Sequence, residues 1–204
     1  MSDVTERNVD GPWDFGDFTI ICGRQPRPEL KDSFWPVYEE SFGPLRVLAA
    51  ARQVLTEDEF SAELEDPRVW KYVALDTDGH VAGLTTVADD ISTMPWISPE
   101  YYQHRYPDEW ARGALFYSGV SLVRPDMRRY PVFSRMVTCL AQRVAAARGI
   151  LAYDMCGYNV ENRSMARASE QILNRVADFE VQAVDVQTYY VARTVGNGSV
   201  KVRE

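Results

Sequence analysis

The sequence predicts an α/β (α+β) fold in which a mixed, mostly antiparallel sheet is flanked by helices. First, two apolar, β-branched runs at residues 68–76 and 80–89 are joined by an Asp-Gly turn, which is typical of a β-hairpin. Second, strands alternate with helices only in the second half of the chain, which favours a mixed sheet over a doubly wound parallel one. Third, a chain of 204 residues that is 46% hydrophobic can bury the core of one ordinary domain without disulfides.

The elements before the hairpin follow from short-range patterns. Residues 17–24 are apolar and β-branched, which predicts a first strand. Apolar residues recur at helical spacing over residues 30–42, and a Gly-Pro pair ends that helix. Thr56 followed by Glu59 is a capping-box sequence that opens a second helix over residues 57–66. We expect the acidic residues of this second helix to lie on solvated faces.

The elements after the hairpin begin with residues 91–112, an insertion that is rich in aromatic residues and carries prolines. The remaining elements are expected to be a strand over 114–123, a helix over 132–149, a strand over 150–158, a helix over 162–178, and one or two closing strands over 179–193. Residues 1–14 and 195–204 lack periodicity, so we expect flexible tails on either side of a single domain spanning residues 15–194.

Composition narrows the classes of function. A net charge of −8 argues against a nucleic-acid binder, because phosphate neutralisation needs a basic face. No run of about 18 apolar residues occurs and the N-terminal stretch is acidic, so we expect no membrane span and a cytoplasmic protein. The three cysteines have no metal-binding spacing and lie in apolar runs, so we expect free, buried thiols and no metal site: Cys22, Cys139 and Cys156.

A local basic cluster stands out in this acidic chain. Four arginines fall within twelve positions: Arg124, Arg128, Arg129 and Arg135. They surround the start of the helix predicted from residue 132, whose unpaired amides and dipole favour an anion. The cluster therefore predicts a small anionic ligand rather than a nucleic-acid polymer.

The segment VRPDMRRYPVFSRMVTCL, residues 123–140, resembles the donor-binding loop and helix of the GNAT acyltransferase superfamily. Val123, Pro125 and Arg128 match the pattern of the family, and the order of elements over residues 17–193 is similar to it as well. The resemblance implies a GNAT-like fold. It also implies an acyltransferase that moves an acetyl or other acyl group from a CoA-type thioester, acetyl-CoA or another acyl-CoA, to an amine.

Two loop glycines of that family are replaced here by Pro131 and Phe133. Glycine lets a pyrophosphate approach main-chain amides, and a proline removes one such donor. Either arginine side chains hold the anion instead, or the anion no longer binds. On the first alternative, the resemblance assigns donor binding to Leu122, Val123, Arg124, Arg128, Arg129, Tyr130, Val132, Phe133, Ser134 and Asn162.

A second match is the segment YNVENRSMARASEQI, residues 158–172, which resembles the Asn-x-x-Met pattern that opens the next helix in the family. By that match Asn162 lies beside the pantetheine arm of the donor, and Met165 packs in the core. Ser169 stands where many members carry a tyrosine that protonates the departing thiolate. A serine hydroxyl is a poor acid, so either water or another residue serves in place of Ser169, or the step is absent. Phe179 is what remains of a following Leu-Gly-Phe motif.

Asp154 is the candidate catalytic base, because it interrupts the apolar strand 150–158 beside which the donor is expected. A lone carboxylate in such a strand costs free energy unless it is paired. Asp154 therefore either takes the proton of the amine or forms an ion pair with a nearby arginine. The resemblance assigns polarisation of the thioester carbonyl to main-chain amides at residues 119–122. The alternative for Gly119 is relief of packing.

Two classes of function stay open. An enzyme would acylate a small-molecule or peptide amine, and its donor would be an acyl-CoA or an acyl carrier protein that meets the basic cluster. The other class is a non-catalytic binding or assembly protein of the same fold, including a homodimer, in which Phe133 fills the donor site. The aromatic residues of the insertion either cover an acceptor pocket or form a packed flap or dimer contact.

Overall fold

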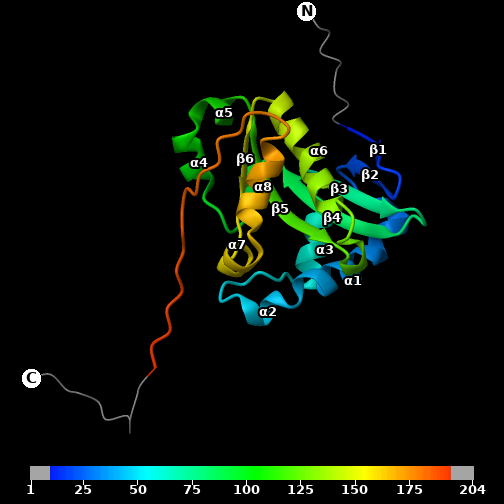
Figure 1. Cartoon of the computed structure of the whole chain (residues 1–204). Helices are drawn as coiled ribbons and strands as arrows, with labels where there is room; N and C mark the ends of the chain where they lie inside the picture. The colour runs from blue at the N-terminus through cyan, green and yellow to red at the C-terminus, as the bar shows by residue number, and fades with distance from the viewer. Residues whose placement is uncertain (1–9, 194–204) are drawn as a thin grey trace, which may run out of the picture.

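The computed structural model describes residues 10–193, which form a six-stranded sheet flanked by helices (Figure 1). The strands lie side by side in chain order, and each neighbouring pair is antiparallel except the last, which is parallel. The strands are β1 (Trp13–Asp14), β2 (Phe18–Gly23), β3 (Val69–Asp76), β4 (Val81–Ala88), β5 (Leu115–Val123) and β6 (Ile150–Tyr153). The predicted fold class is confirmed.

Helices cover both faces of the sheet. The α-helices are α1 (Lys31–Phe42), α2 (Leu45–Leu48), α3 (Glu57–Glu65), α4 (Pro99–Arg105), α5 (Pro107–Ala111), α6 (Val132–Ala146), α7 (Gly157–Arg163) and α8 (Met165–Leu173). Short 3-10 turns are η1 (Pro28–Leu30), η2 (Ile91–Thr93) and η3 (Pro125–Met127). α1 and α3 pack on one face, and α6 packs on the other with α8 against it (Figure 1). Within residues 10–193, no helix is long and apolar enough to cross a bilayer.

The core consists of two apolar layers because side chains alternate across each strand. On β3, Val73 packs with the α1 and α3 side chains, whereas the neighbouring Tyr72 packs with α6. Tyr38 of α1 stacks on Phe60 of α3 at 4.3 Å between ring centroids, which joins these two helices. α3 begins at the predicted capping box, with both reciprocal hydrogen bonds formed. The three cysteines are free thiols; Cys139 and Cys156 are buried as predicted, whereas Cys22 is only partly buried.

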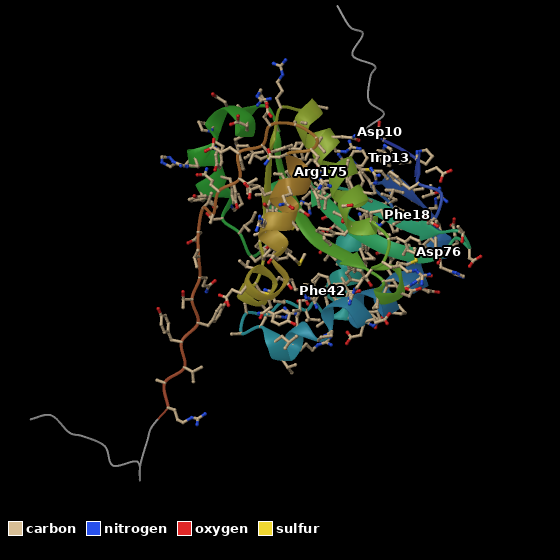
Figure 2. All side chains as sticks on the ribbon, viewed as in Figure 1. Asp10, Trp13, Phe18, Phe42, Asp76 and Arg175 are labelled. Carbon is tan, nitrogen blue, oxygen red and sulfur yellow. The ribbon has the colours of Figure 1, made fainter. Side chains whose placement is uncertain are left out.

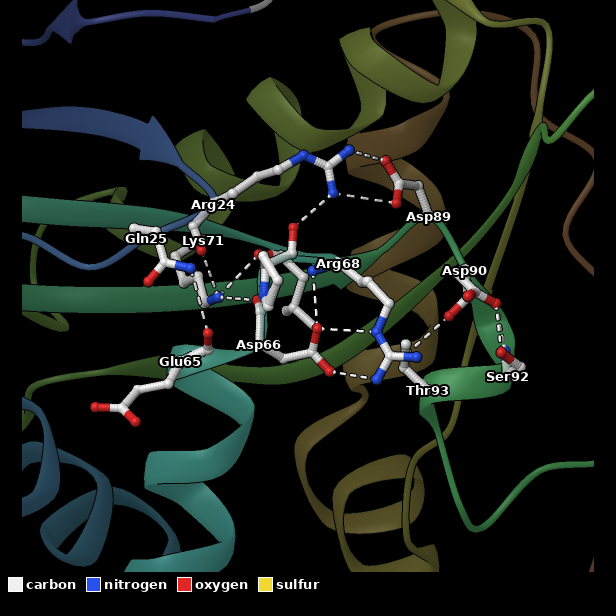
Figure 3. A network of polar contacts seen from close by, with 12 residues as sticks. Arg24, Gln25, Glu65, Asp66, Arg68, Lys71, Asp89, Asp90, Ser92 and Thr93 are labelled. Atoms are coloured by element: carbon white, nitrogen blue, oxygen red, sulfur yellow. Dashed lines mark hydrogen bonds and ion pairs between the residues drawn. The ribbon is translucent and has the colours of Figure 1, made fainter.

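A polar network fixes the chain where β2 ends and β3 begins (Figure 3). The Lys71 ammonium is buried and donates to the main-chain oxygens of Arg24 at 2.7 Å, Asp66 at 2.7 Å and Val69 at 2.9 Å. The guanidinium of Arg24 forms an ion pair with Asp89, just beyond β4. The network therefore ties the ends of three strands together.

The N-terminal boundary lies earlier than predicted, because residues 10–14 belong to the fold. β1 pairs with β2, and the Trp13 ring stacks on Tyr72 at 6.1 Å between centroids. The Asp10 carboxylate accepts a 2.7 Å hydrogen bond from Arg143 of α6, and Figure 2 shows Asp10 and Trp13 close together at this end of the sheet. Aromatic packing and an ion pair hold a segment that shows no periodicity in the sequence. The predicted tails over residues 1–9 and 195–204 lie outside the described residues.

The closing strands predicted over residues 179–193 do not form in the described chain. β6 is the last strand of the sheet, and residues 180–193 carry no regular secondary structure. They run along the outside near α4 and then away from the body (Figure 1). The pattern of apolar residues predicts a strand, but a strand also needs a partner edge, which this segment does not reach within its own chain.

The helix predicted over residues 162–178 is two helices, and the strand predicted over residues 150–158 is shorter. Ser164 adopts a left-handed conformation with φ of 50°, which separates α7 from α8. β6 ends at Tyr153, and α7 begins only four residues later. Met165, expected in the core, is partly exposed at the start of α8.

Candidate active site

The parallel strands β5 and β6 separate halfway along β5. Their pairing runs from Leu115 opposite Ile150 to Ser118 opposite Tyr153, and there β6 ends. β5 continues to Val123, paired on its other side with β4. We call residues 119–123 together with residues 154–156 the β5–β6 divergence.

Main-chain amides of β5 are available at the divergence. The Arg124 amide donates to the Ala82 oxygen of β4 at 2.9 Å. Because main-chain groups alternate in direction along a strand, the amides of Ser121 and Val123 face the opposite side, where β6 has ended. An extended ligand with amide groups can therefore pair along this edge of β5.

A β-bulge lies at the beginning of the divergence. Two residues of β5, Gly119 and Val120, lie opposite the single residue Thr86 of β4. The Val120 amide donates to Thr86 Oγ1 at 2.8 Å, and Thr86 Oγ1 donates to Glu63 Oε1 at 2.6 Å. A Cβ atom on Gly119 would lie 2.8 Å from both of those oxygens. Packing thus accounts for Gly119, and the Val120 amide is already paired.

Glu63 corrects the expectation that the acidic residues of α3 are all solvated. Its carboxyl group turns inward to the bulge, and burial raises its pKa above the usual range, although the hydrogen bond from Thr86 opposes that shift. The sequence does contain a signal for this orientation. Phe60, Glu63 and Leu64 have the spacing of one helical face, and Phe60 and Leu64 are core residues.

Asp154 is held by a chain of hydrogen bonds rather than by an arginine. The Trp96 indole N–H donates to the Tyr117 hydroxyl at 3.2 Å, and that hydroxyl donates to Asp154 Oδ1 at 2.5 Å. Tyr117 is buried, and burial together with the hydrogen bond to Asp154 raises the pKa of its phenol. The phenol therefore stays a donor at neutral pH. The Asp154 residue is exposed at the divergence.

The first turn of α6 lies at the end of β5, beyond η3. Arg135 is the first residue whose amide donates back to the preceding turn, to the Pro131 oxygen at 3.0 Å, and no side chain caps this end. The amides of Val132, Phe133 and Ser134 are thus the group that a helix start offers to an anion. The Phe133 ring packs with α8 and with side chains of β6, in a cluster that contains no β5 residue. It therefore lies on the α6 side of the sheet.

The arginines of the basic cluster have different surroundings. Arg124 is engaged by Asp76 at 2.8 Å and Asp126 at 2.7 Å, and it donates to the Val81 oxygen at 2.9 Å. Because these contacts occupy its guanidinium group, we do not assign Arg124 to the anion site. Arg128 and Arg129 are exposed near the start of α6.

Two arginines of the cluster lie over aromatic rings. The Arg129 guanidinium lies 4.9 Å from the centroid of the Tyr130 ring, which is partly buried. Arg135 lies 5.0 Å from the centroid of Phe15 near β2. Among the donor-binding side chains that the resemblance implies, those of Arg128 and Arg129 are the ones positioned for a charged ligand.

The second sequence match is divided between two surfaces. Asn162 is exposed on α7, and Ser169 is buried on α8 with 6% of its surface accessible. Asn159, the first asparagine of the segment 158–172, was not among the residues predicted for the site. Its Oδ1 atom is buried and has no hydrogen-bond partner. Among the described residues, no other buried side-chain oxygen or nitrogen lacks one.

Asn159 lies near the divergence. Cys156, at the N-terminal end of α7, packs with Val120 and Leu122 of β5. The first turn of α7 is therefore close to the free edge of β5. An unpaired acceptor at this place fits a ligand that brings an N–H group.

Two cavities lie away from the divergence. A surface hollow of about 570 Å³ is lined by residues of α8, including Arg167, and by residues just after it, including Arg175, which is labelled in Figure 2. A smaller cavity of about 160 Å³ lies beside β2 and Lys71. A donor at the divergence would thus lie along the main chain of β5 rather than inside either cavity.

Similar folds occur among solved acetyltransferases. An aminoglycoside acetyltransferase from an uncultured soil metagenomic sample, in complex with sisomicin, has a TM-score of 0.49 and 13% identity, over 87% of this chain and 97% of that one. A ribosomal-protein-alanine N-acetyltransferase from Brucella melitensis has a TM-score of 0.47 and 13% identity, over 84% and 99%.

AAC(6')-Iy, in complex with the bisubstrate analogue CoA-S-monomethyl-acetylneamine, has a TM-score of 0.44 and 15% identity, over 86% of this chain and 99% of that one. No protein-family model matches the sequence, and no curated protein matches it. At identities of 13–15% such a likeness concerns the fold alone.

Proposed function

We propose that the protein is an N-acyltransferase that moves an acyl group from a CoA-type thioester to an amine. The observation that carries the proposal is the β5–β6 divergence, where β5 presents the amides of Ser121 and Val123 beyond the end of β6. A pantetheine arm contains amide groups that can pair with such an edge in the manner of an added strand. The diphosphate would then lie at the uncapped start of α6, next to Arg128 and Arg129.

Asp154 is the base in this proposal. The amine must lose a proton as its nitrogen attacks the thioester carbonyl carbon, and an exposed carboxylate at the divergence can accept that proton. Tyr117 and Trp96 orient the carboxylate through the two hydrogen bonds described above. The carbon–sulfur bond then breaks, and the thiolate leaves. Ser169 is buried and a weak acid, so we assign the protonation of the thiolate to water.

The position of Phe133 supports an enzyme rather than a blocked relative. A blocked donor site would need the ring between β5 and β6, and its packing partners lie on α6, α8 and β6. The exposed Arg128 and Arg129 also suit the acidic surface of an acyl carrier protein. The carrier is therefore a second donor to be tested beside acetyl-CoA.

Substitution of Asp154 tests the proposal. Asp154→Asn should lower kcat/KM for acyl transfer by at least about 100-fold, because it removes the proton acceptor. Tyr117→Phe should lower it less, since it removes only the hydrogen bond that orients the carboxylate. The assay follows thiol release from acetyl-CoA or an acylated carrier protein with a panel of small-molecule and peptide amines.

The control is Asp178→Asn, which removes an exposed carboxylate outside the network. Donor affinity, measured by calorimetry, should be the same in all three variants and the parent. An Asp154→Asn variant with full activity would exclude this residue as the base. If neither donor binds the parent at millimolar concentration, the enzyme assignment fails altogether.

A further inference from the structure

Residues 180–193, which we call the C-terminal segment, expose several large apolar side chains close together in the chain. Single exposed apolar residues are ordinary, but a contiguous group marks an interaction site. The accessible fractions in the segment are Val184 42%, Val186 79%, Tyr189 52%, Tyr190 90% and Val191 94%. β-branched and aromatic residues favour a strand, so the composition fits an extended segment that pairs with another strand.

The sheet has a strand edge without a partner at the opposite end from β1. β6 pairs with β5 on one side, and among residues 10–193 no strand pairs with its outer side. All four of its residues are apolar or aromatic yet only partly buried. Such an edge presents main-chain donors and acceptors in a row, ready to pair with an added strand.

The C-terminal segment does not reach the β6 edge of its own chain. The start of the segment is held near α8. The Phe179 amide donates to Oδ1 of Asn174, just after α8, at 3.0 Å, and Val181 packs in the α6–α8 cluster. Asp185 lies near enough to Tyr102 of α4 to interact with it electrostatically. From there the chain leads outward, away from the sheet (Figure 1). The sequence from 180 to 195 contains no Gly, Pro or Asn that favours a reversal.

We propose that the C-terminal segment of one copy pairs with the outer edge of β6 in a second copy. The exchange would be reciprocal, because each copy has both the segment and the edge, and a two-fold dimer satisfies both at once. Main-chain hydrogen bonds would supply the pairing, and the side chains on one side of the strand, Val184, Val186 and Tyr190, would bury their apolar surface against the partner. Since β6 ends one residue before Asp154, the partner's segment would also pass beside the proposed catalytic base.

The first experiment measures mass and protection together. Light scattering on the full chain should give twice the 23.2 kDa chain mass. The Ile150 amide donates to Ala114 of its own chain, so the amides of Leu151 and Tyr153 are the ones that face the outer edge of β6. Hydrogen exchange should be slow at Leu151 and Tyr153, and it should become faster on dilution to the monomer.

Matched variants test the surface itself. Val186 and Tyr190 lie on the same side of an extended strand, whereas Gln187 lies on the other side. Val186→Glu combined with Tyr190→Glu should raise the concentration for half-dissociation by at least about tenfold, because two charges would enter an apolar contact. Gln187→Glu adds a charge to the opposite side of the same segment and should leave that concentration unchanged. Circular dichroism of each variant confirms that the fold is retained.

Each outcome decides the proposal. A concentration-dependent dimer that protects β6 and is lost only in the double variant supports it. A monomer at all concentrations overturns it, whether the amides of Leu151 and Tyr153 are exposed or protected, since their protection in a monomer means pairing within one chain. A dimer that survives the double variant, or that leaves β6 unprotected, places the interface elsewhere. The acyl donor is absent from these measurements, so their failure is separate from failure of the proposed function.

Discussion

The residues with the clearest physical roles are buried charged groups, and Lys71 is the first of them. Its ammonium makes three hydrogen bonds to main-chain oxygens, which is the full capacity of the group (Figure 3). Burial lowers its pKa to about 8, although the nearby carboxylates of Asp66 and Glu63 oppose that shift. Lys71 is therefore a structural donor, and no nucleophilic role is needed to explain it.

Lys71→Met should destabilise the fold by about 1–3 kcal/mol, because main-chain oxygens lose their donor. The pH dependence has a definite sign. Between its folded pKa of about 8 and its unfolded pKa near 10.4, Lys71 binds fewer protons in the folded state than in the unfolded state. The parent should thus gain stability relative to the variant as pH rises through that window. Urea unfolding at pH 7.5 and pH 10 measures both effects. A difference in the free energy of unfolding between parent and variant that becomes smaller as pH rises would contradict the expected pH dependence.

Glu63 is expected to change the pH dependence of stability in the opposite direction. Its folded pKa is raised by burial, so above the unfolded pKa the folded state binds more protons than the unfolded state, and stability falls as pH rises. Glu63→Gln keeps an acceptor for Thr86 and removes this titration. The variant should therefore gain stability relative to the parent between pH 5 and pH 8 in urea unfolding. Glu40→Gln, at an exposed position of α1, is the control and should show no such trend.

At the scale of single residues, the sequence predicts candidates but not their partners. Asp154 can be identified in the sequence as the one acidic residue in an apolar run. Its hydrogen-bond partner Tyr117 lies 37 residues away, and the sequence does not predict that contact. Arg124 is the converse case. It matches the basic cluster in sequence, yet Asp76 from the β3–β4 hairpin engages it, and that contact follows only from the sheet pairing.

At the scale of elements, local patterns predict what local physics determines. The capping box at the start of α3, the β3–β4 hairpin and the apolar stripe of α6 all depend on neighbours within a few residues, and all three form as expected. The break between α7 and α8 occurs at Ser164, and no glycine at that position indicates it in the sequence. The bulge in β5 depends on Thr86 of β4 and Glu63 of α3. The sequence around Gly119 contains neither residue, so the role of this glycine could not be predicted from it.

The bulge predicts a sharp effect of adding one methyl group. Gly119→Ala should destabilise the fold by about 1–3 kcal/mol, because its Cβ would meet Thr86 Oγ1 and Glu63 Oε1 and disturb the hydrogen bond of the Val120 amide. Gly157→Ala is the matched control, since the space at that position is open and its φ is not positive. Equal thermal unfolding of the two variants would mean that the bulge tolerates the methyl group.

At the scale of the whole molecule, the sequence predicts strands over residues 179–193, and the described chain forms none there. Alternation of apolar residues reports a tendency to pair, and it carries no information about the partner. The same limit applies to the donor site. The basic cluster indicates an anion, but the edge of β5 that would hold the rest of the donor exists only because β6 ends early.

The central claim is that a CoA-type donor lies along β5 and ends at the start of α6. Hydrogen exchange of the full chain, with and without saturating acetyl-CoA, tests it most directly. We expect slower exchange at the amides of Ser121, Val123 and residues 132–134, with no change at Val120, whose amide is already bonded to Thr86. Unchanged exchange at all of these amides under saturating donor would contradict the claim.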